Sequence, residues 1–147
     1  MNQETEVKET YEQLIKAWND RNAERMAELF TDSGELIGFD GSLVQNREEI
    51  VSHLQPIFEN HPTPPFIHKV KEVKFLGEQS VLLRAIAGMV TPGEDDINPE
   101  MNTHHTLVLI REKDEWKVEL FQNTPAQFHG RPELVEEMTN ELKEQSG

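Results

Sequence analysis

The sequence predicts an α+β fold in which a curved antiparallel sheet wraps around N-terminal helices. Near the start of the chain, apolar residues recur every three or four positions between charged ones, which is typical of amphipathic helices. From residue 66 onward, long segments rich in Val, Ile and Leu alternate with short turns, which is typical of β-strands. Helices first and strands later is the order of an α+β domain.

The first helix is predicted from apolar residues at steps of four, three and four, which place them on one face. Asn19 to Asn22 interrupt this pattern, and Asp20 or Asn22 can cap a second, short helix, so we expect a helical hairpin. The apolar face of the first helix consists of Val7, Tyr11, Leu14 and Trp18.

The next segment predicts a small β-hairpin and a third helix. Residues 31–34 have turn composition, residues 35–39 read as a short strand, and Asp40-Gly41 is a two-residue hairpin signal. Asn46, followed three residues later by Glu49, resembles a capping box. Pro56 lacks an N–H and clashes with the preceding turn, so it should kink this helix or end it near Gln55.

The second half of the chain predicts an antiparallel meander followed by a C-terminal helix. The strands are expected at residues 66–76, 80–90, 101–112 and 116–124, and the helix at about 131–144. No repeat or linker divides the chain, so residues 1–147 are expected to form a single domain.

Composition excludes several classes of function. The chain has 14 Lys+Arg and 28 Asp+Glu, a net charge of −14, which argues against nucleic acid and anionic membranes as partners. The absence of cysteine removes disulfides, thiolate nucleophiles and Cys-ligated metal sites. The start of the chain lacks signal-peptide features, and the longest apolar run, residues 107–110, is too short to span a bilayer. We therefore expect a soluble, cytoplasmic protein without a cofactor.

Several segments carry a family resemblance: residues 11–20 (YEQLIKAWND), 27–34 (AELFTDSG), Asp40-Gly41, residues 47–50 (REEI), 104–109 (HHTLVL) and 116–125 (WKVELFQNTP). They resemble the SgcJ/EcaC family of the nuclear transport factor 2-like, SnoaL-like superfamily, over roughly residues 5–128. The resemblance implies a cystatin-like α+β cone with a cavity between sheet and helices, usually as a homodimer. It implies fold better than function, because the superfamily includes isomerases, dehydratases, cyclases, epoxide hydrolases and non-enzymatic binders.

Strand register predicts which side chains line the cavity. A turn at Lys113-Asp114 places His105 opposite Gln122, and both are expected to face the interior and hold a polar ligand group. A satisfied structural histidine is the alternative. The same register assigns Leu107, Leu109, Val118 and Leu120 to the interior and Val108, Ile110 and Phe121 to the outer face.

The resemblance adds a candidate catalytic group, because superfamily enzymes sometimes carry a carboxylate where Asp40 lies. Asp40 would accept a proton while His105, aided by Gln122, polarises or protonates a substrate oxygen. The alternative is that Asp40 serves only the hairpin turn. Tyr11 and Trp18 are expected on the cavity floor, with core packing as the alternative reading.

No metal site is expected. His104 and His105 are adjacent in a strand and should point to opposite faces, so their rings cannot easily chelate one ion. The face of His68 depends on whether residues 69–71 contain a bulge, and the sequence leaves it open.

These observations favour a cavity protein that binds a small, mostly apolar organic molecule, with isomerase, dehydratase or cyclase chemistry as an extension. The alternative is a non-catalytic dimeric interaction module whose own side chains fill the cavity. A homodimer is expected because both faces of the sheet are apolar. The competing explanation is that the C-terminal helix covers the outer face within one chain.

Overall fold

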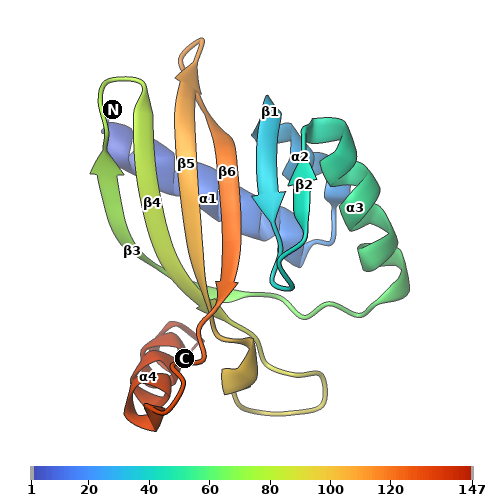
Figure 1. Ribbon diagram of the computed structural model, residues 1–147, viewed down its shortest axis with the longest axis vertical. Coiled ribbons are helices and arrows are strands. Elements are labelled where there is room, and N and C mark those ends of the chain that lie inside the picture. Colours follow the sequence, from blue (N-terminus) through green and yellow to red (C-terminus); the bar gives the residue numbers. More distant parts are fainter. Residues whose placement is uncertain (1, 147) are drawn as a thin grey trace.

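The computed structural model describes residues 2–146, without the side chain of Ser146, and has the α+β architecture that the sequence predicts (Figure 1). Two helices, α1 (Gln3–Asn19) and α2 (Ala23–Glu28), precede the first strand. A third helix, α3 (Arg47–Asn60), lies between the second and third strands. The strands are β1 (Phe30–Ile37), β2 (Leu43–Gln45), β3 (Ile67–Phe75), β4 (Ser80–Gly88), β5 (Thr103–Glu112) and β6 (Glu115–Pro125). A short 3-10 helix, η1 (Pro99–Met101), lies before β5, and α4 (Pro132–Ser146) ends the chain.

The six strands form one sheet in the order β2-β1-β6-β5-β4-β3. The run from β3 to β6 is the predicted antiparallel meander, whereas β1 pairs with β6 in parallel. In Figure 1, α1 crosses behind the sheet, and α2 and α3 lie beside β1 and β2. The main apolar core fills the space between these helices and the sheet.

Asparagine side chains start the first three helices. The side chains of Asn2, Asn22 and Asn46 accept hydrogen bonds from backbone N–H groups inside their helices, which satisfies donors that otherwise lack partners. The predicted caps Asn22 and Asn46 are therefore confirmed.

Pro56 does not end α3 near Gln55, since the helix continues to Asn60. The other predicted outcome, a kink at Pro56, stays a prediction. Ile50, Leu54 and Phe58 are buried on one face on both sides of the proline. One missing hydrogen bond costs less than exposing that apolar face. The guanidinium of Arg21 donates to the carbonyls of Phe58 and His61 and so caps the end of this helix.

Residues 31–34 were predicted to be a turn but lie within β1. The register between β1 and β6 shifts between Phe30 and Glu35, so these turn-prone residues form an irregular strand segment. Gly34 is required there, since a Cβ would lie 2.8 Å from the Phe30 ring and 2.9 Å from the Val118 carbonyl oxygen. The loop of the hairpin at Asp40 is also longer than the predicted two residues. Ile37 pairs with Leu43, so residues 38–42 form the loop.

Two bulges set the faces of the sheet. Between β3 and β4, Lys71 is the extra residue, and between β5 and β6 it is Glu119. Beyond Glu119 the register places Phe121 inside and Leu120 outside, which reverses the prediction for both residues. A single extra residue reverses the faces because side chains alternate with period two.

The outer face is only partly covered. Helix α4 packs on β3, β4 and η1 through a second apolar cluster that includes Ile86, Met138 and Leu142. Lys69 and Lys71 form ion pairs with Glu141 and hold the helix there.

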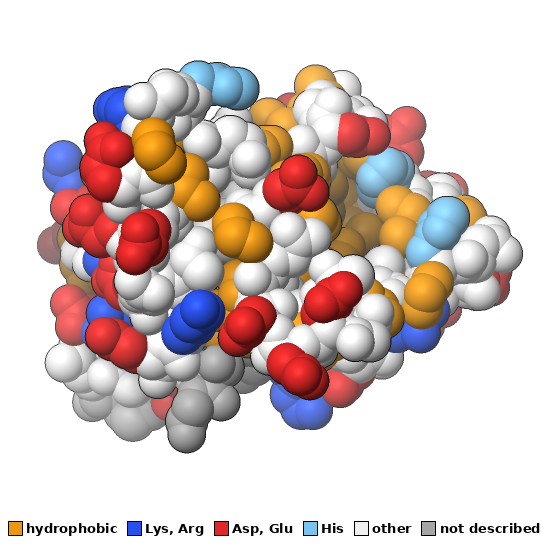
Figure 2. Space-filling model, turned by 90° about the horizontal axis from the view of Figure 1, so that it is seen from below, with side chains coloured by type: hydrophobic (Ala, Val, Ile, Leu, Met, Phe, Trp, Pro, Cys, Tyr) orange, Lys and Arg blue, Asp and Glu red, His pale blue; other side chains and the backbone are white. Residues whose placement is uncertain are grey.

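Seen from below, acidic side chains are spread over the surface, basic ones are scattered, and hydrophobic ones appear between them and in a hollow on the right (Figure 2).

Candidate functional site

The centre of the candidate site is a hydrogen-bonded pair, Tyr11 and His105. Tyr11 lies on the buried face of α1, and His105 lies on the inner face of β5. The Tyr11 hydroxyl is 2.9 Å from His105 Nδ1, and both side chains have an exposed fraction of 0%. The structure thus brings together two of the residues that the sequence nominated from segments 94 positions apart.

Burial keeps both members of this pair uncharged. Desolvation is the main cause that lowers the pKa of His105 to about 3, followed by the charges of His68 and His104. Desolvation also raises the pKa of Tyr11 well above its usual value, with the Glu12 carboxylate as a smaller cause. At neutral pH the pair is therefore a phenol and a neutral imidazole.

The hydrogen-bond inventory assigns the imidazole tautomer. If the Tyr11 hydroxyl donates to Nδ1, the ring proton must reside on Nε2. The reverse arrangement would leave the phenol proton without an acceptor in a fully buried position, which is costly. We therefore assign the proton to Nε2, and His105 Nε2 has no hydrogen-bond partner in the described part of the chain.

Aromatic rings surround His105. The rings of Phe66 and Phe121 meet its ring edge to face, with centroids 4.8 Å and 4.9 Å away. Trp18, half-buried at the end of α1, packs against Phe66 at 5.1 Å. The result is an apolar surrounding with one unpaired N–H donor, suited to an apolar molecule that carries a single acceptor.

A surface hollow lies next to this cluster, between α1 and the edge strand β3. It has a volume of about 540 Å³, and Phe66, His68, Glu12 and Lys8 are among its lining residues. His68 Nε2 lies 2.6 Å from the Glu12 carboxylate, and the His68 ring meets the Tyr11 ring at 5.5 Å. The bulge at Lys71 settles the open question of His68, because its partner is the inner-face residue Ala87.

Gln122 does not join His105, contrary to the predicted register. The extra residue Glu119 shifts the pairing, so Gln122 lies opposite Thr106 and Asn123 lies opposite His105. Gln122 therefore belongs to the outer face of β6, whereas His105 belongs to the interior.

Asp40 is exposed in the turn between β1 and β2. Its carboxylate accepts a hydrogen bond from the Ser42 N–H at 2.9 Å, and this bond is the main cause that lowers its pKa. The position shows the turn chemistry of an Asp-Gly pair and does not bring the carboxylate into the buried cluster. A base role for Asp40 stays a prediction.

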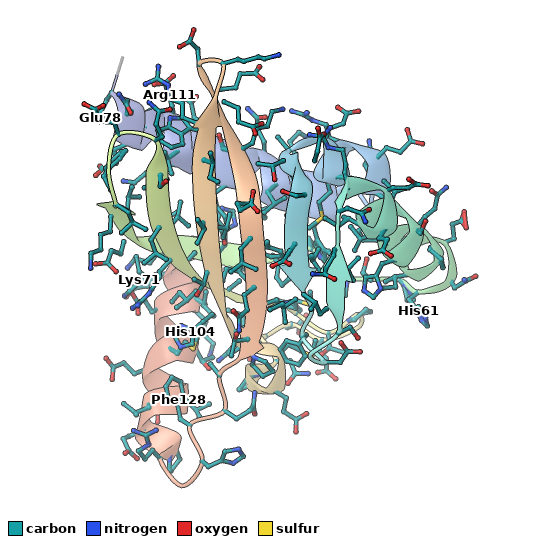
Figure 3. The ribbon with its side chains drawn as sticks, turned by 45° about the horizontal axis from the view of Figure 1, so that its top comes forward. His61, Lys71, Glu78, His104, Arg111 and Phe128 are labelled. Atoms are coloured by element: carbon teal, nitrogen blue, oxygen red, sulfur yellow. The ribbon has the colours of Figure 1, made fainter. Side chains whose placement is uncertain are left out.

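His104 and His105 point to opposite faces of β5, as their adjacency predicts. His104 lies at the lower end of the strand, toward Phe128 and α4 (Figure 3). The centroids of the His104 and Phe128 rings are 6.3 Å apart. Among the described side chains, no group of three or more His, Asp and Glu residues is arranged to hold a metal ion. None of the helices within residues 2–146 combines the length and apolar character needed to cross a membrane.

Sequence reasoning missed Phe66 and Phe121 as site residues and left His68 undecided. Phe66 opens the predicted β region after a proline-rich loop, which gives no signal of a ring turned onto His105. Phe121 was placed outside because the bulge at Glu119 has no recognisable sequence signature. Period-two register therefore found His105 but not its neighbours.

Comparison with known proteins identifies the family. Residues 7–122 match the SnoaL-like domain family, and the chain belongs to it. No curated protein matches the chain. The solved structures that resemble it share the nuclear transport factor 2-like, cystatin-like fold.

One similar structure is a domain of unknown function with a cystatin-like fold from Nostoc punctiforme, 22% identical, covering 91% of this chain and 83% of that one, with a TM-score of 0.80. Another, from Thiobacillus denitrificans, is provisionally named a calcium/calmodulin-dependent protein kinase type II association domain (17% identity, 80% and 93% coverage, TM-score 0.72). A third is a ketosteroid isomerase-like protein from Erwinia carotovora (12% identity, 84% and 95% coverage, TM-score 0.68). At these identities the likeness shows the fold alone.

Proposed function

We propose that this domain binds a small, mostly apolar organic molecule through one hydrogen-bond-accepting oxygen, which His105 Nε2–H holds. The observation that carries the proposal is the unpartnered, fully buried Nε2 of His105. Leaving a buried donor unsatisfied costs about 1–3 kcal/mol, and a ligand carbonyl or ether oxygen would recover much of that cost. The surrounding rings of Phe66 and Phe121 favour an apolar ligand body.

The ketosteroid isomerase-like neighbour supports small-molecule chemistry on this fold by analogy. The neutral state of His105 fits a hydrogen-bond donor to a substrate oxygen better than a cationic acid. Isomerase, dehydratase or cyclase activity with Asp40 as base is the more specific version of the proposal, and it requires Asp40 to approach the ligand.

The binding proposal can be tested with two probes of nearly equal shape, 2-acetylnaphthalene and 2-ethylnaphthalene, which differ in one acceptor oxygen. We expect the wild-type protein to bind the ketone up to about tenfold more tightly, the value of one hydrogen bond to a neutral donor. The preference should disappear in the double variant Tyr11→Phe/His105→Phe, which removes both members of the pair together.

His104→Phe is the matched control, because it replaces the neighbouring histidine on the outer face and should leave the ketone preference intact. Titrations followed by NMR would report both affinity and the residues that shift. Equal affinity for the two probes, or a preference that survives in the double variant, would contradict the proposal.

A second candidate function is a non-catalytic interaction module, and the filled interior favours it. Tyr11, Phe66, His105 and Phe121 are buried against one another, so the protein's own side chains occupy the centre of the fold. The Thiobacillus neighbour, named after an association domain, supports assembly on this fold by analogy. In this reading neither naphthalene probe would bind.

Homodimerisation through the outer sheet face fits either function. Leu82, Val108, Ile110 and Leu120 are only partly buried on the part of that face that lies beyond the main contacts of α4. A second copy would cover them. Sedimentation of the wild type should show a dimer and Val108→Lys a monomer, and a wild-type monomer at micromolar concentration would remove the dimer.

Two finer assignments remain proposals. Membership of the SgcJ/EcaC family rests on the segments that resemble it, above all the strand from Trp116 to Pro125. A cytoplasmic location rests on the acidic composition and the absence of cysteine.

A further inference from the structure

The hollow between α1 and β3 and the buried His105 are separated by very little protein. Phe66 and His68 both line the hollow, and both contact the buried pair on their other side. The Phe66 ring lies 4.8 Å from the His105 ring, and the His68 ring lies 5.5 Å from the Tyr11 ring. One layer of side chains therefore divides the hollow, about 540 Å³ in volume, from the buried Tyr11–His105 pair.

Hydrogen bonds fix the backbone of this dividing layer at Phe66. The Asn19 side chain accepts a hydrogen bond from the Phe66 N–H at 2.8 Å and donates to the Phe66 carbonyl at 3.4 Å. These two bonds hold the Phe66 backbone against the end of α1. Opening past Phe66 therefore requires a change of its side-chain rotamer and no change of the main chain.

The other half of the layer is a hydrogen-bonded pair at the protein surface, His68 and Glu12. His68 is 23% exposed and Glu12 is 53% exposed, and the 2.6 Å contact between them joins two side chains that line the hollow. Pairs with this degree of exposure contribute little to stability, so thermal motion breaks them readily. Lys8 and Lys69 also line the hollow, but each pairs with a carboxylate that is not among its lining residues, Glu4 and Glu141.

We propose that the hollow between α1 and β3 is the outer compartment of the ligand site, and that Phe66 together with the Glu12–His68 pair forms a gate between it and His105. This inference rests on the proposed function for its ligand, an apolar molecule with one acceptor oxygen. The hollow falls within the volume range of small-molecule sites. The gate explains how a ligand reaches a side chain with no exposed surface.

The gate can be tested without any ligand by acylation of histidines with diethyl pyrocarbonate. This reagent acylates the lone-pair nitrogen of a neutral imidazole, which in His105 is the Nδ1 that accepts from Tyr11. Reaction therefore requires both access and release of the Tyr11 hydrogen bond, and a difference in rate between variants that keep Tyr11 reports a difference in access. Peptide mass spectrometry resolves each of the six histidines. His104, the exposed neighbour on the same strand, serves as the internal reference.

We expect Glu12→Ala to raise the rate at His105 relative to His104 about two- to fivefold, the range for loss of one largely exposed polar contact. Phe66→Leu, which keeps an apolar side chain but removes the ring, should raise it further. Asp20→Ala is the matched control, because it breaks the Lys16–Asp20 pair elsewhere on α1 and should leave the rate unchanged.

Dependence on urea separates the gate from global unfolding. Rotation of a few side chains exposes little surface, so the His105 rate should stay nearly constant at urea concentrations below the unfolding transition. A rate that rises as steeply as the unfolded fraction would overturn the gate, as would unchanged rates in both Glu12→Ala and Phe66→Leu.

The two proposals fail separately. Faster acylation of His105 in the gate variants, without any ketone preference, would reject the ligand proposal and keep the gate. A ketone preference that depends on His105, with acylation rates unaffected by Glu12→Ala and Phe66→Leu, would reject the gate and keep the ligand.

Discussion

The two faces of strand β5 place neighbouring residues in opposite environments. On the inner face, His105 and Leu107 are fully buried. On the outer face, His104 is exposed and Val108 is half-buried, because α4 packs mainly on β3 and β4. The comparison teaches that the environment of a histidine in β5 depends on which face of the strand it occupies.

The two faces should differ most in how much free energy of unfolding is lost when an apolar side chain is shortened to alanine. Leu107→Ala should lower the free energy of unfolding by about 2–5 kcal/mol, because a fully buried side chain leaves a cavity. Val108→Ala, one residue away, should cost below about 1.5 kcal/mol because its site is partly exposed. Urea unfolding of both variants measures the comparison, and equal losses would show that the outer face is covered as well.

The next largest effect is a dependence of the free energy of unfolding on pH, caused by His105 on the inner face. The pKa of His105 is lowered to about 3 in the folded state, whereas an unfolded histidine titrates near ~6.5. Protons therefore bind the unfolded state more strongly than the folded state. The contribution of neutral His105 to the free energy of unfolding is fully present above pH ~6.5 and is lost as the pH falls toward 3.

The slope of this loss should approach about 1.4 kcal/mol per pH unit in the middle of that window. His105→Gln, which can still hydrogen-bond Tyr11, should remove this contribution and flatten the curve, whereas His104→Gln should remove much less of it. Chemical unfolding at a series of pH values measures both curves. Parallel curves for the wild type and His105→Gln would contradict the lowered pKa.

A smaller effect is expected where α4 is anchored to the outer face. Glu141 pairs with both Lys69 and Lys71, and hydrogen bonds from Lys71 and then Lys69 are the main causes that lower its pKa. Glu141→Gln should destabilise α4 by up to about 1 kcal/mol, and added salt should reduce the difference. Hydrogen exchange in residues 132–146 is the measurement, and protection in β5 should not change.

The smallest effect on stability is expected at Asp40, outside both faces. Asp40→Asn keeps an oxygen that accepts from the Ser42 N–H, so the unfolding transition should remain close to that of the wild type. If Asp40 is a catalytic base, turnover of an identified substrate should fall by about 10²–10⁴-fold with the fold intact. Normal turnover in Asp40→Asn would leave Asp40 with its turn role alone.

The sequence by itself determined the element order and the inner face of β5. The helical period identified α1 with Tyr11 on its buried side, and alternation placed Leu107, Leu109 and His105 inside. These inferences succeeded because local periodicity reports directly which side of a helix or strand is apolar. The caps at Asn22 and Asn46 succeeded for the same local reason.

Only the tertiary structure decided which residues surround His105. The bulge at Glu119 exchanges Leu120 for Phe121 on the inner face and separates Gln122 from His105, and the bulge at Lys71 places His68. Both bulges reverse the side-chain alternation beyond them, although no local pattern marks their positions. The contact between Tyr11 and His105 spans 94 residues, and it exists because α1 and β5 pack together in the folded core.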